Sequence, residues 1–265
     1  MKDIIIQKLK EIESEDSIKI VFAIESGSRV WGMEGTDSDY DIRFVYARPI
    51  EDYITVGKKS DTIMRAYDKE GKVQAQQGCI IDVQGMDIIK YAKLLSSSNP
   101  TAIEWLKSDI LYYGEQPKVF QDFAYKKSNP KTLYYHYKSL CKNNYKKYLS
   151  NNTDVTTKRY LYCMRGLVNS LLVKRIWIPP PIKFEQALVD AFDLEEINEE
   201  TYNLIMDKIK EKKGQKEKKQ IPRCERSDKF IEVELEKDEA PDSKRVFGTN
   251  KDIDDEIRKH VLGWR

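Results

Sequence analysis

Two strand-like runs, separated by a Gly-Ser turn and a polar loop, constrain the fold of this chain more than any other feature. Residues 18–24 read IKIVFAI, a β-rich run that predicts a strand. The chain then turns through Gly27 and Ser28 into a short helical piece, and the loop MEGTDSD leads to a second predicted strand at residues 40–46. This order predicts a protein that mixes α and β structure and carries polar motifs at the ends of buried strands.

The acidic pair Asp39 and Asp41 lies at the start of the second predicted strand. Alternate side chains of a strand share a face, so the two carboxylates point the same way while Tyr40 and Ile42 pack into the core. Two like charges side by side repel each other, and a divalent cation resolves that repulsion. Carboxylate oxygens suit Mg²⁺, which binds through one or two carboxylates together with substrate phosphates. The pair therefore indicates a magnesium site, with Mn²⁺ as a possible substitute.

The Gly-Ser turn supplies the complementary half of such a site. Exposed backbone N–H groups and the Ser28 hydroxyl can hold triphosphate oxygens, and Gly27 lets the phosphates approach the backbone. Asp82, in the strand-like run CIIDV, is the best-placed third acid to orient an attacking hydroxyl. The mechanism that we expect is in-line displacement at the α-phosphate, with two metal ions roughly 3.5–4 Å apart and pyrophosphate as the leaving group.

Three further polar residues near the acidic pair have alternative interpretations. Arg43 lies on the same strand face as the aspartates and either touches phosphate or neutralises them. Asp37 is interpreted as shaping the turn before the strand. Asp87 is a helix N-cap in the favoured interpretation and the third acid in the other.

The stretch GSRVWGMEGTDSDYDIRFVY resembles the predicted nucleotidyltransferases called RNA-repair-pathway DNA polymerase β (RlaP-like) proteins, whose members read G-S-x-x-W-G and then S-D-Y-D-x-R. Other segments agree with that family, among them IDVQGMDIIKYAKLL, SNPTAIEWLKS and PPPIKFEQAL. The similarity covers roughly residues 20–190.

The resemblance implies a fold and a site. The fold is α+β, a polymerase-β-like nucleotidyltransferase core with a mixed sheet, followed by a mainly α-helical domain that closes over the nucleotide. The substrate is ATP-like and is used with Mg²⁺. Gly27 and Ser28 match the phosphate motif, Asp39 and Asp41 the metal pair, and Asp82 the third acid, whose spacing varies among relatives.

Helical patterns dominate after about residue 130, so we predict a catalytic domain at residues 1–120 and a helical substrate-binding and nucleotide-closing domain at residues 121–265. Seven lysines fall between Lys208 and Lys219, and residues 208–250 are predicted to be partly flexible. The lysine run is interpreted either as a solvated helix end or as a contact for RNA.

Two faces in the helical half are candidate substrate surfaces. One helical face carries Lys158, Tyr162, Arg165 and Asn169. We expect this face either to contact the triphosphate or base, or to place Arg165 in a structural pair with a carboxylate. Lys138, Lys142 and Lys146 form a basic stripe beside a tyrosine seam on the preceding helix. That stripe either binds nucleic acid or is a solvated face.

The amino-acid composition limits which partners the chain can bind. Formal net charge is +2 from 46 Lys and Arg against 44 Asp and Glu, so any nucleic-acid contact has to come from a local cluster. The four cysteines lack the close spacing of metal or redox motifs and are predicted to be reduced and buried. No run approaches the ~20 apolar residues of a membrane span. We therefore expect a cytoplasmic location and no membrane partner.

The function that these observations favour is Mg²⁺-dependent transfer of a nucleoside monophosphate from a nucleoside triphosphate to an acceptor hydroxyl. The family resemblance supplies an RNA 3′ end as the favoured acceptor, in an RNA-repair or tRNA-directed role. One alternative is transfer to a protein or small molecule. The other is a non-catalytic module that binds nucleic acid.

Overall fold

The computed structural model describes residues 1–152, 155–216, 219–243 and 251–263. These residues form two compact units. The sheet unit contains residues 1–30 and 39–127 together with the helix at 251–262, and the helical unit contains residues 31–38 and 128–243. The protein is α+β, with a mixed sheet followed by a mainly helical part, as the sequence predicts.

The sheet has five strands in the order β3 (Thr62–Tyr67), β4 (Ile81–Asp87), β2 (Tyr40–Ala47), β1 (Lys19–Ser26) and β5 (Leu111–Gly114). Only the β2–β4 pair is parallel, and the other neighbouring strands run antiparallel. The predicted strands at 18–24 and 40–46 are therefore confirmed as β1 and β2. The strand predicted near Cys79 forms as β4, which begins two residues later and extends to Asp87.

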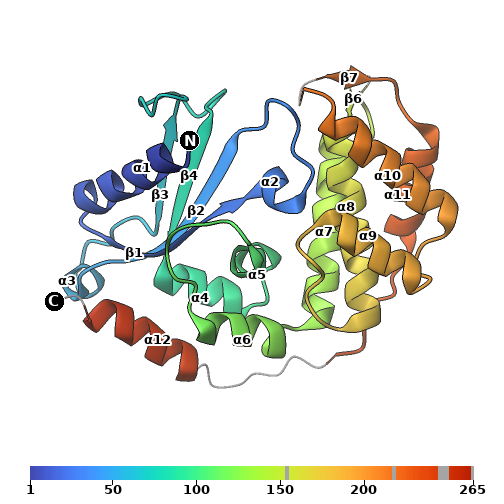
Figure 1. Ribbon diagram of the computed structural model, residues 1–265. Helices are drawn as coiled ribbons and strands as arrows, with labels where there is room; N and C mark the ends of the chain where they lie inside the picture. The colour runs from blue at the N-terminus through green and yellow to red at the C-terminus, as the bar shows by residue number, and fades with distance from the viewer. Residues whose placement is uncertain (153–154, 217–218, 244–250, 264–265) are drawn as a thin grey trace. The chain divides into compact units, whose positions relative to one another are not determined.

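Helices cover both faces of this sheet (Figure 1). The helix α1 (Lys2–Glu15) packs on one face, where its buried Ile5, Leu9 and Ile12 join a core cluster with Ile42 and Phe44 of β2. On the other face Phe22 of β1 meets Tyr91 of α4 (Ile88–Ser96) edge to face at 5.7 Å. Further helices of the unit are α3 (Ile50–Tyr53), α5 (Pro100–Lys107), α6 (Lys118–Lys127) and α12 (Lys251–Leu262), the last of which contacts α4 and α6.

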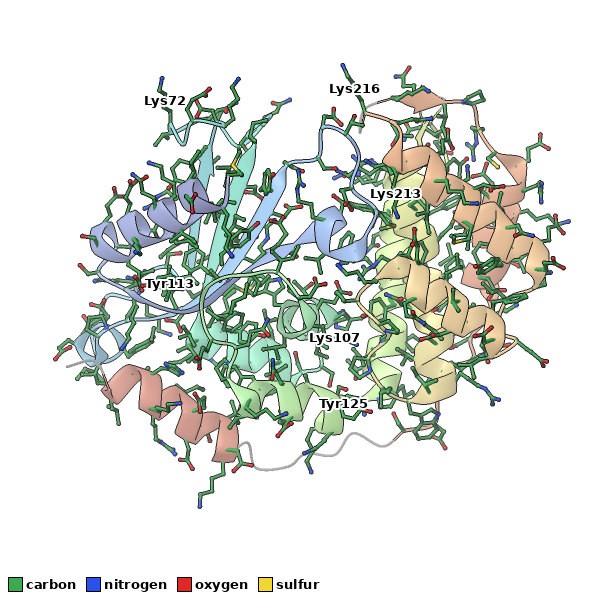
Figure 2. The ribbon with its side chains drawn as sticks, in the orientation of Figure 1. Lys72, Lys107, Tyr113, Tyr125, Lys213 and Lys216 are labelled. Atoms are coloured by element: carbon green, nitrogen blue, oxygen red, sulfur yellow. The ribbon has the colours of Figure 1, made fainter. Side chains whose placement is uncertain are left out.

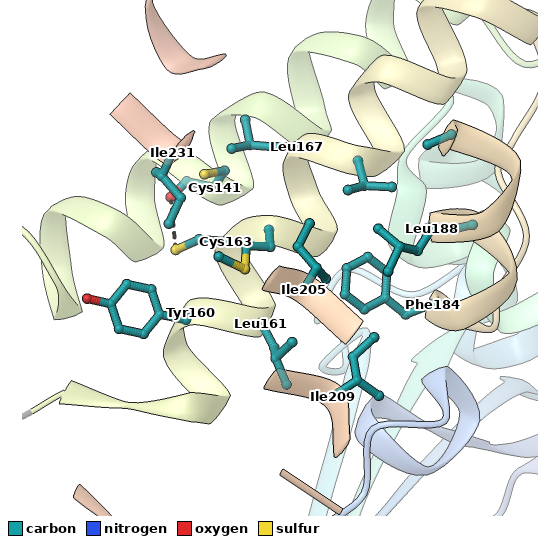
Figure 3. Close-up of a cluster of buried hydrophobic side chains, with 14 of the residues drawn as sticks. Cys141, Tyr160, Leu161, Cys163, Leu167, Phe184, Leu188, Ile205, Ile209 and Ile231 are labelled. Carbon is teal, nitrogen blue, oxygen red and sulfur yellow. Dashed lines mark hydrogen bonds between the residues drawn. The ribbon is translucent and has the colours of Figure 1, made fainter. Parts of the chain in front are cut away.

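The helical unit is built around α8 (Thr157–Ile176), which is buried along most of its length. Around it pack α7 (Pro130–Tyr148), α9 (Phe184–Asp193), α10 (Glu199–Lys213) and α11 (Glu225–Glu236). Two short strands, β6 (Val155–Thr156) and β7 (Gln220–Ile221), pair beside the start of α8. Figure 3 shows the core where these helices meet, with Leu161 and Leu167 of α8 among side chains from α9, α10 and α11.

The sheet unit extends to residue 127, beyond the predicted division at residue 120, and the units differ from that division in two further places. Residues 31–38 of the loop before β2 belong to the helical unit, because Met33 is buried in its core and Trp31 packs edge to face on Tyr162 at 5.4 Å. The helix α12, at the other end of the chain, belongs to the sheet unit. Both assignments depend on contacts between residues far apart in sequence, which a change of local composition does not reveal.

The segment 208–250, predicted to be partly flexible, contains the end of α10 and all of α11; residues 244–250 of it lie outside the described residues. Lys208 is buried with its ammonium group 4.8 Å from the centre of the Tyr160 ring, and Lys212 is buried as well. Lys213 pairs with Glu185 at 2.6 Å. Lys213 and Lys216 lie at the end of α10 and just beyond it (Figure 2). The first four lysines of the run, Lys208 to Lys213, thus belong to a helix that buries two of them.

None of the helices that the structure describes is both long enough and apolar enough to cross a membrane. All four cysteines are free, and Cys79, Cys141 and Cys163 are buried, as predicted, while Cys224 is half-buried.

Candidate active site

Asp41 and Asp82 lie directly opposite each other on the parallel strands β2 and β4. One nitrogen of the Arg43 guanidinium, Nη2, donates to Asp41 Oδ1 and to Asp82 Oδ2, each at 2.9 Å. Its other terminal nitrogen donates to the carbonyl oxygens of Ile42 and Asp82, both at 3.0 Å. The side chains of Arg43, Asp41 and Asp82 are 15%, 23% and 18% exposed, so the cluster is partly shielded yet reaches the surface. Arg43 therefore pairs with both carboxylates in this structure, and its predicted contact with phosphate stays a prediction.

Asp39 directly precedes β2 and is held through its backbone. Arg29 Nε donates to the Asp39 carbonyl oxygen at 2.9 Å, and the Arg29 guanidinium lies 3.8 Å from the centre of the Tyr40 ring. Among the described residues no group of three or more His, Cys, Asp or Glu is arranged to hold a metal ion. A physical reason is that Arg43 stands between Asp41 and Asp82. The assignment of Asp39, Asp41 and Asp82 as metal ligands stays a prediction.

Gly27 brings the Gly-Ser turn against the acidic pair. It begins the short helix α2 (Gly27–Trp31) with φ of +66°, and a Cβ at this position would lie 2.1 Å from Asp41 Oδ2. Glycine is therefore required both by the backbone conformation and by the close approach of the carboxylate. Gly27, of the predicted phosphate motif, thus lies beside the Asp41 carboxylate. Ser28 is almost wholly buried, and its contact with phosphate stays a prediction.

Glu25, the last acidic residue of β1, is a neighbour of this site that the sequence analysis did not select. It is fully buried and accepts hydrogen bonds from the Asp41 backbone N–H at 2.8 Å and the Tyr112 hydroxyl at 2.6 Å. Burial raises its pKa to about 7, against the smaller opposing effect of these hydrogen bonds. The available signal was an acidic residue at the end of an apolar strand, immediately before the Gly-Ser turn.

Glu25 should make stability depend on pH. Its pKa rises from 4.5 to about 7 on folding, so its contribution is fully present below about pH 4.5 and is lost as pH rises toward 7. Glu25→Gln removes this titration and can keep both hydrogen bonds. We expect the wild type to lose up to about 3 kcal/mol relative to the variant between pH 4.5 and 8, in denaturant titrations without metal. Parallel pH profiles for the two proteins would contradict this expectation.

Gln76 is a second neighbour without a sequence signal. It lies in the exposed loop between β3 and β4, and its side-chain Nε2 donates a short hydrogen bond to Asp82 Oδ1. Asp82 therefore has partners on both oxygens, Gln76 on one and Arg43 on the other. Nothing in the local pattern around Gln76 distinguishes it from Gln74 or Gln77.

Asp87 is a helix cap, as the favoured interpretation has it. Its carboxylate accepts from the Ile89 backbone N–H at 2.8 Å and from the Tyr53 hydroxyl at 2.7 Å, and burial raises its pKa. Asp87 is also five residues along β4 from Asp82, which corresponds to roughly 17 Å. Asp37, by contrast, lies in the exposed turn before β2.

The predicted nucleotide contacts Lys158 and Arg165 lie on α8, in the helical unit. Arg165 is 3% exposed and its guanidinium lies 4.0 Å from the centre of the Trp31 ring. Lys158 lies 5.6 Å from the centre of the Tyr162 ring. The predicted face therefore gathers around Trp31 and Tyr162, and its contact with nucleotide stays a prediction.

Arg165→Ala should lower the free energy of unfolding by about 1–3 kcal/mol, because it removes a buried cation–π contact and the packing of a long side chain. Thermal or denaturant unfolding measures this loss. Nucleotide affinity, measured well below the melting temperature, tests the predicted contact separately. An affinity equal to that of the wild type would reject a role of Arg165 in nucleotide binding.

Two comparisons with known proteins agree on the family of this chain. The model of the RNA repair pathway DNA polymerase beta family, RlaP, matches residues 1–256. The chain is 31% identical over 268 residues to the "Uncharacterized protein YcgL" of Bacillus subtilis (strain 168), and the match covers 99% of this chain and 95% of that protein.

Two solved structures show weaker likeness. Spectinomycin adenyltransferase AAD(9) from Enterococcus faecialis, with ATP and spectinomycin, is 12% identical with a TM-score of 0.43, and the match covers 88% of this chain and 98% of that chain. A nucleotidyltransferase-like protein from Exiguobacterium sibiricum 255-15 is 10% identical with a TM-score of 0.29, over 78% of this chain and 74% of that chain.

Proposed function

Since the chain belongs to the RNA repair pathway DNA polymerase beta family, we propose that it transfers a nucleoside monophosphate from a nucleoside triphosphate to an acceptor hydroxyl. One observation carries the proposal. Asp41 and Asp82 are held face to face on adjacent strands, with Gly27 directly against Asp41. Like charges are costly to bring together, and here their repulsion is offset by Arg43. A protein that only binds nucleic acid has no need of this arrangement.

The donor set fits a divalent cation, because carboxylate oxygens are the ligands that Mg²⁺ prefers and those of Asp41 and Asp82 already surround one cationic group. Asp39, Asp41 and Asp82 would hold the Mg²⁺ ions, or Mn²⁺ in their place. When bound, the metal would stabilise charge on the attacking and leaving oxygens.

The residues of the chain account for the remaining steps. Arg43 exchanges a carboxylate partner for a phosphate oxygen when the nucleotide enters, because guanidinium groups bind both kinds of anion. Gly27 lets the Asp41 carboxylate lie against the turn whose backbone N–H groups hold the triphosphate oxygens. Asp82 orients the acceptor hydroxyl and accepts its proton. The acceptor oxygen forms a bond with the α-phosphorus, the bond to the β-phosphate oxygen breaks, and pyrophosphate leaves.

The acceptor that we propose is the 3′ hydroxyl of an RNA, on the basis of the RNA repair pathway in the family description. The test incubates the protein with each labelled nucleoside triphosphate, Mg²⁺ and cellular RNA, and then locates the label. Label on RNA ends supports this acceptor. Label on protein or on a small molecule rejects the RNA acceptor and keeps nucleotidyl transfer.

A further inference from the structure

The helices α7 and α8 carry a charge imbalance that the net charge of the whole chain conceals. Between residues 123 and 184 the sequence has thirteen Lys and Arg but one acidic residue, Asp154, which lies outside the described residues. Neither α7 nor α8 contains an Asp or Glu. Basic groups without acidic neighbours attract polyanions through local charge, whatever the net charge of the chain.

Acidic groups from other elements compensate one end of this helix pair. Lys174, near the end of α8, pairs with Glu196 at 2.7 Å and with Glu239 at 2.9 Å. In the first half of α7, Lys138 donates a short hydrogen bond to the Lys237 carbonyl oxygen. Lys174 and Lys138 therefore already have partners within the chain. For this reason we do not include Lys138, which the sequence placed in the basic stripe, in the candidate RNA-binding surface.

The opposite end of the helix pair differs in its ion pairing. It lies where α7 finishes and α8 begins, beside β6 and β7 (Figure 1). Lys142, Lys146 and Lys147 are exposed, and within the described part of the chain neither they nor Arg159 take part in an ion pair. Two acids of α11 contact tyrosines at this end, and neither pairs with these cations. Asp228 binds Arg223 and Tyr160, and Glu232 accepts from Tyr145.

Tyr148 holds two of these cations in place. The Arg159 guanidinium lies 3.5 Å from the centre of its ring and the Lys147 ammonium 4.9 Å, so one half-buried aromatic ring joins the two helices through their basic residues. The pKa of the Tyr148 hydroxyl is lowered, first by Lys147 and then by Arg159, which agrees with a locally positive field. Cations that are already ordered lose less entropy when they bind an anion.

The spacing of the cations selects an extended anion over a compact one. Lys142 and Lys146 are four residues apart on one helical face, about 6 Å along the axis. That separation is comparable with the few ångströms between successive charges of a nucleic-acid strand. A free triphosphate, in contrast, is bound by donors that converge on one point, as backbone N–H groups do in a phosphate-binding loop.

We propose that Lys142, Lys146, Lys147 and Arg159, the basic end of the α7–α8 pair, bind the phosphate backbone of a single-stranded RNA. That the strand is RNA rests on the proposed function, whereas the recognition of a strand of phosphates rests on the charges themselves. The contact is independent of sequence, because it involves no base edges.

The test compares two triple variants of the full chain that lose the same charge. Lys142→Gln/Lys146→Gln/Lys147→Gln alters the basic end. Lys210→Gln/Lys216→Gln/Lys229→Gln alters three exposed lysines of the same unit and also examines the run after Lys208. Binding of a fluorescent, unstructured oligoribonucleotide is measured by anisotropy over a range of salt concentrations, and melting temperatures verify that both variants are folded.

The basic-end variant should bind more weakly for every RNA sequence, and its slope of log affinity against log salt should flatten by about 2, at roughly 0.7 per lost phosphate contact. The control variant should match the wild type. Equal slopes for the basic-end variant and the wild type, or equal loss in both variants, would overturn the proposal.

Two further binding measurements test for ligands other than single-stranded RNA at the basic end. Displacement of the RNA by excess ATP, or binding of duplex RNA alone, would also overturn the proposal. The nucleotidyl-transfer assay is independent of these results. It can succeed with a different acceptor when the basic end binds no RNA, and it can fail while the basic end binds RNA as proposed.

Discussion

Asp41→Asn and Asp82→Asn should each reduce nucleotidyl transfer by a factor on the order of a thousand or more, the scale on which removal of a principal catalytic group acts. Each substitution removes a carboxylate from the pair that would hold the metal. Arg43 keeps one of its two carboxylate partners in either variant, so the fold should survive. Initial rates at saturating Mg²⁺, together with melting temperatures, measure both effects.

Asp87→Asn provides the matched control, because it makes the same substitution on the same strand as Asp82 at the opposite end. Asn serves as a helix N-cap about as well as Asp, so stability should change little. Transfer should remain close to that of the wild type. Near-normal turnover of Asp41→Asn or Asp82→Asn would mean that these carboxylates are not the catalytic site.

Gly27→Ala should be nearly as damaging to activity and should also lower stability. The added Cβ would lie 2.1 Å from Asp41 Oδ2, so the carboxylate or the turn must move. Backbone with φ of +66° costs a residue other than glycine about 1–2 kcal/mol. Catalysis depends on placement to within an ångström, and we therefore expect a loss of transfer of about a hundredfold.

Gly57→Ala is the control for this change, since a Cβ at Gly57 meets no atom within 4 Å and its φ lies outside the left-handed region. It should alter neither activity nor stability appreciably. A Gly27→Ala protein with wild-type kcat/KM would show that the close approach of Asp41 to the turn is irrelevant to the reaction.

Local patterns were sufficient to predict the parts of the fold that depend on neighbours in sequence. Residues 18–24 and 40–46 alternate or cluster apolar residues as strands do, and α1 places Ile5, Leu9 and Ile12 on one face. Hydrophobic periodicity reports such elements directly, because burial of one face is what stabilises them.

The pairing within the site was not predictable in the same way. Arg43 reaches Asp82 because β4 lies parallel and in register beside β2, although 39 residues separate the two in the chain. The burial of Glu25 and the contact of Gln76 likewise depend on which strands and loops become neighbours. Charge along the sequence gave Arg43 two equally good roles, and only the sheet order revealed that it lies between two carboxylates.

The burial of lysines in the run from Lys208 to Lys219 was likewise not predictable from local sequence. Lys208 and Lys212 looked like surface charges by composition, yet both are buried on α10. The ring of Tyr160, 48 residues earlier in the chain, lies under the ammonium group of Lys208. Counting charges along a segment does not reveal which of them face the core of a helical bundle.

The most direct test of the central claim is the release of pyrophosphate in step with transfer of the nucleoside monophosphate. Wild-type protein is incubated with each of the four nucleoside triphosphates, RNA and Mg²⁺, and pyrophosphate and labelled product are quantified together. We predict one pyrophosphate per monophosphate transferred, with loss of both in excess EDTA and in Asp41→Asn. Release of inorganic phosphate in place of pyrophosphate, or product formation undiminished in Asp41→Asn, would contradict the account.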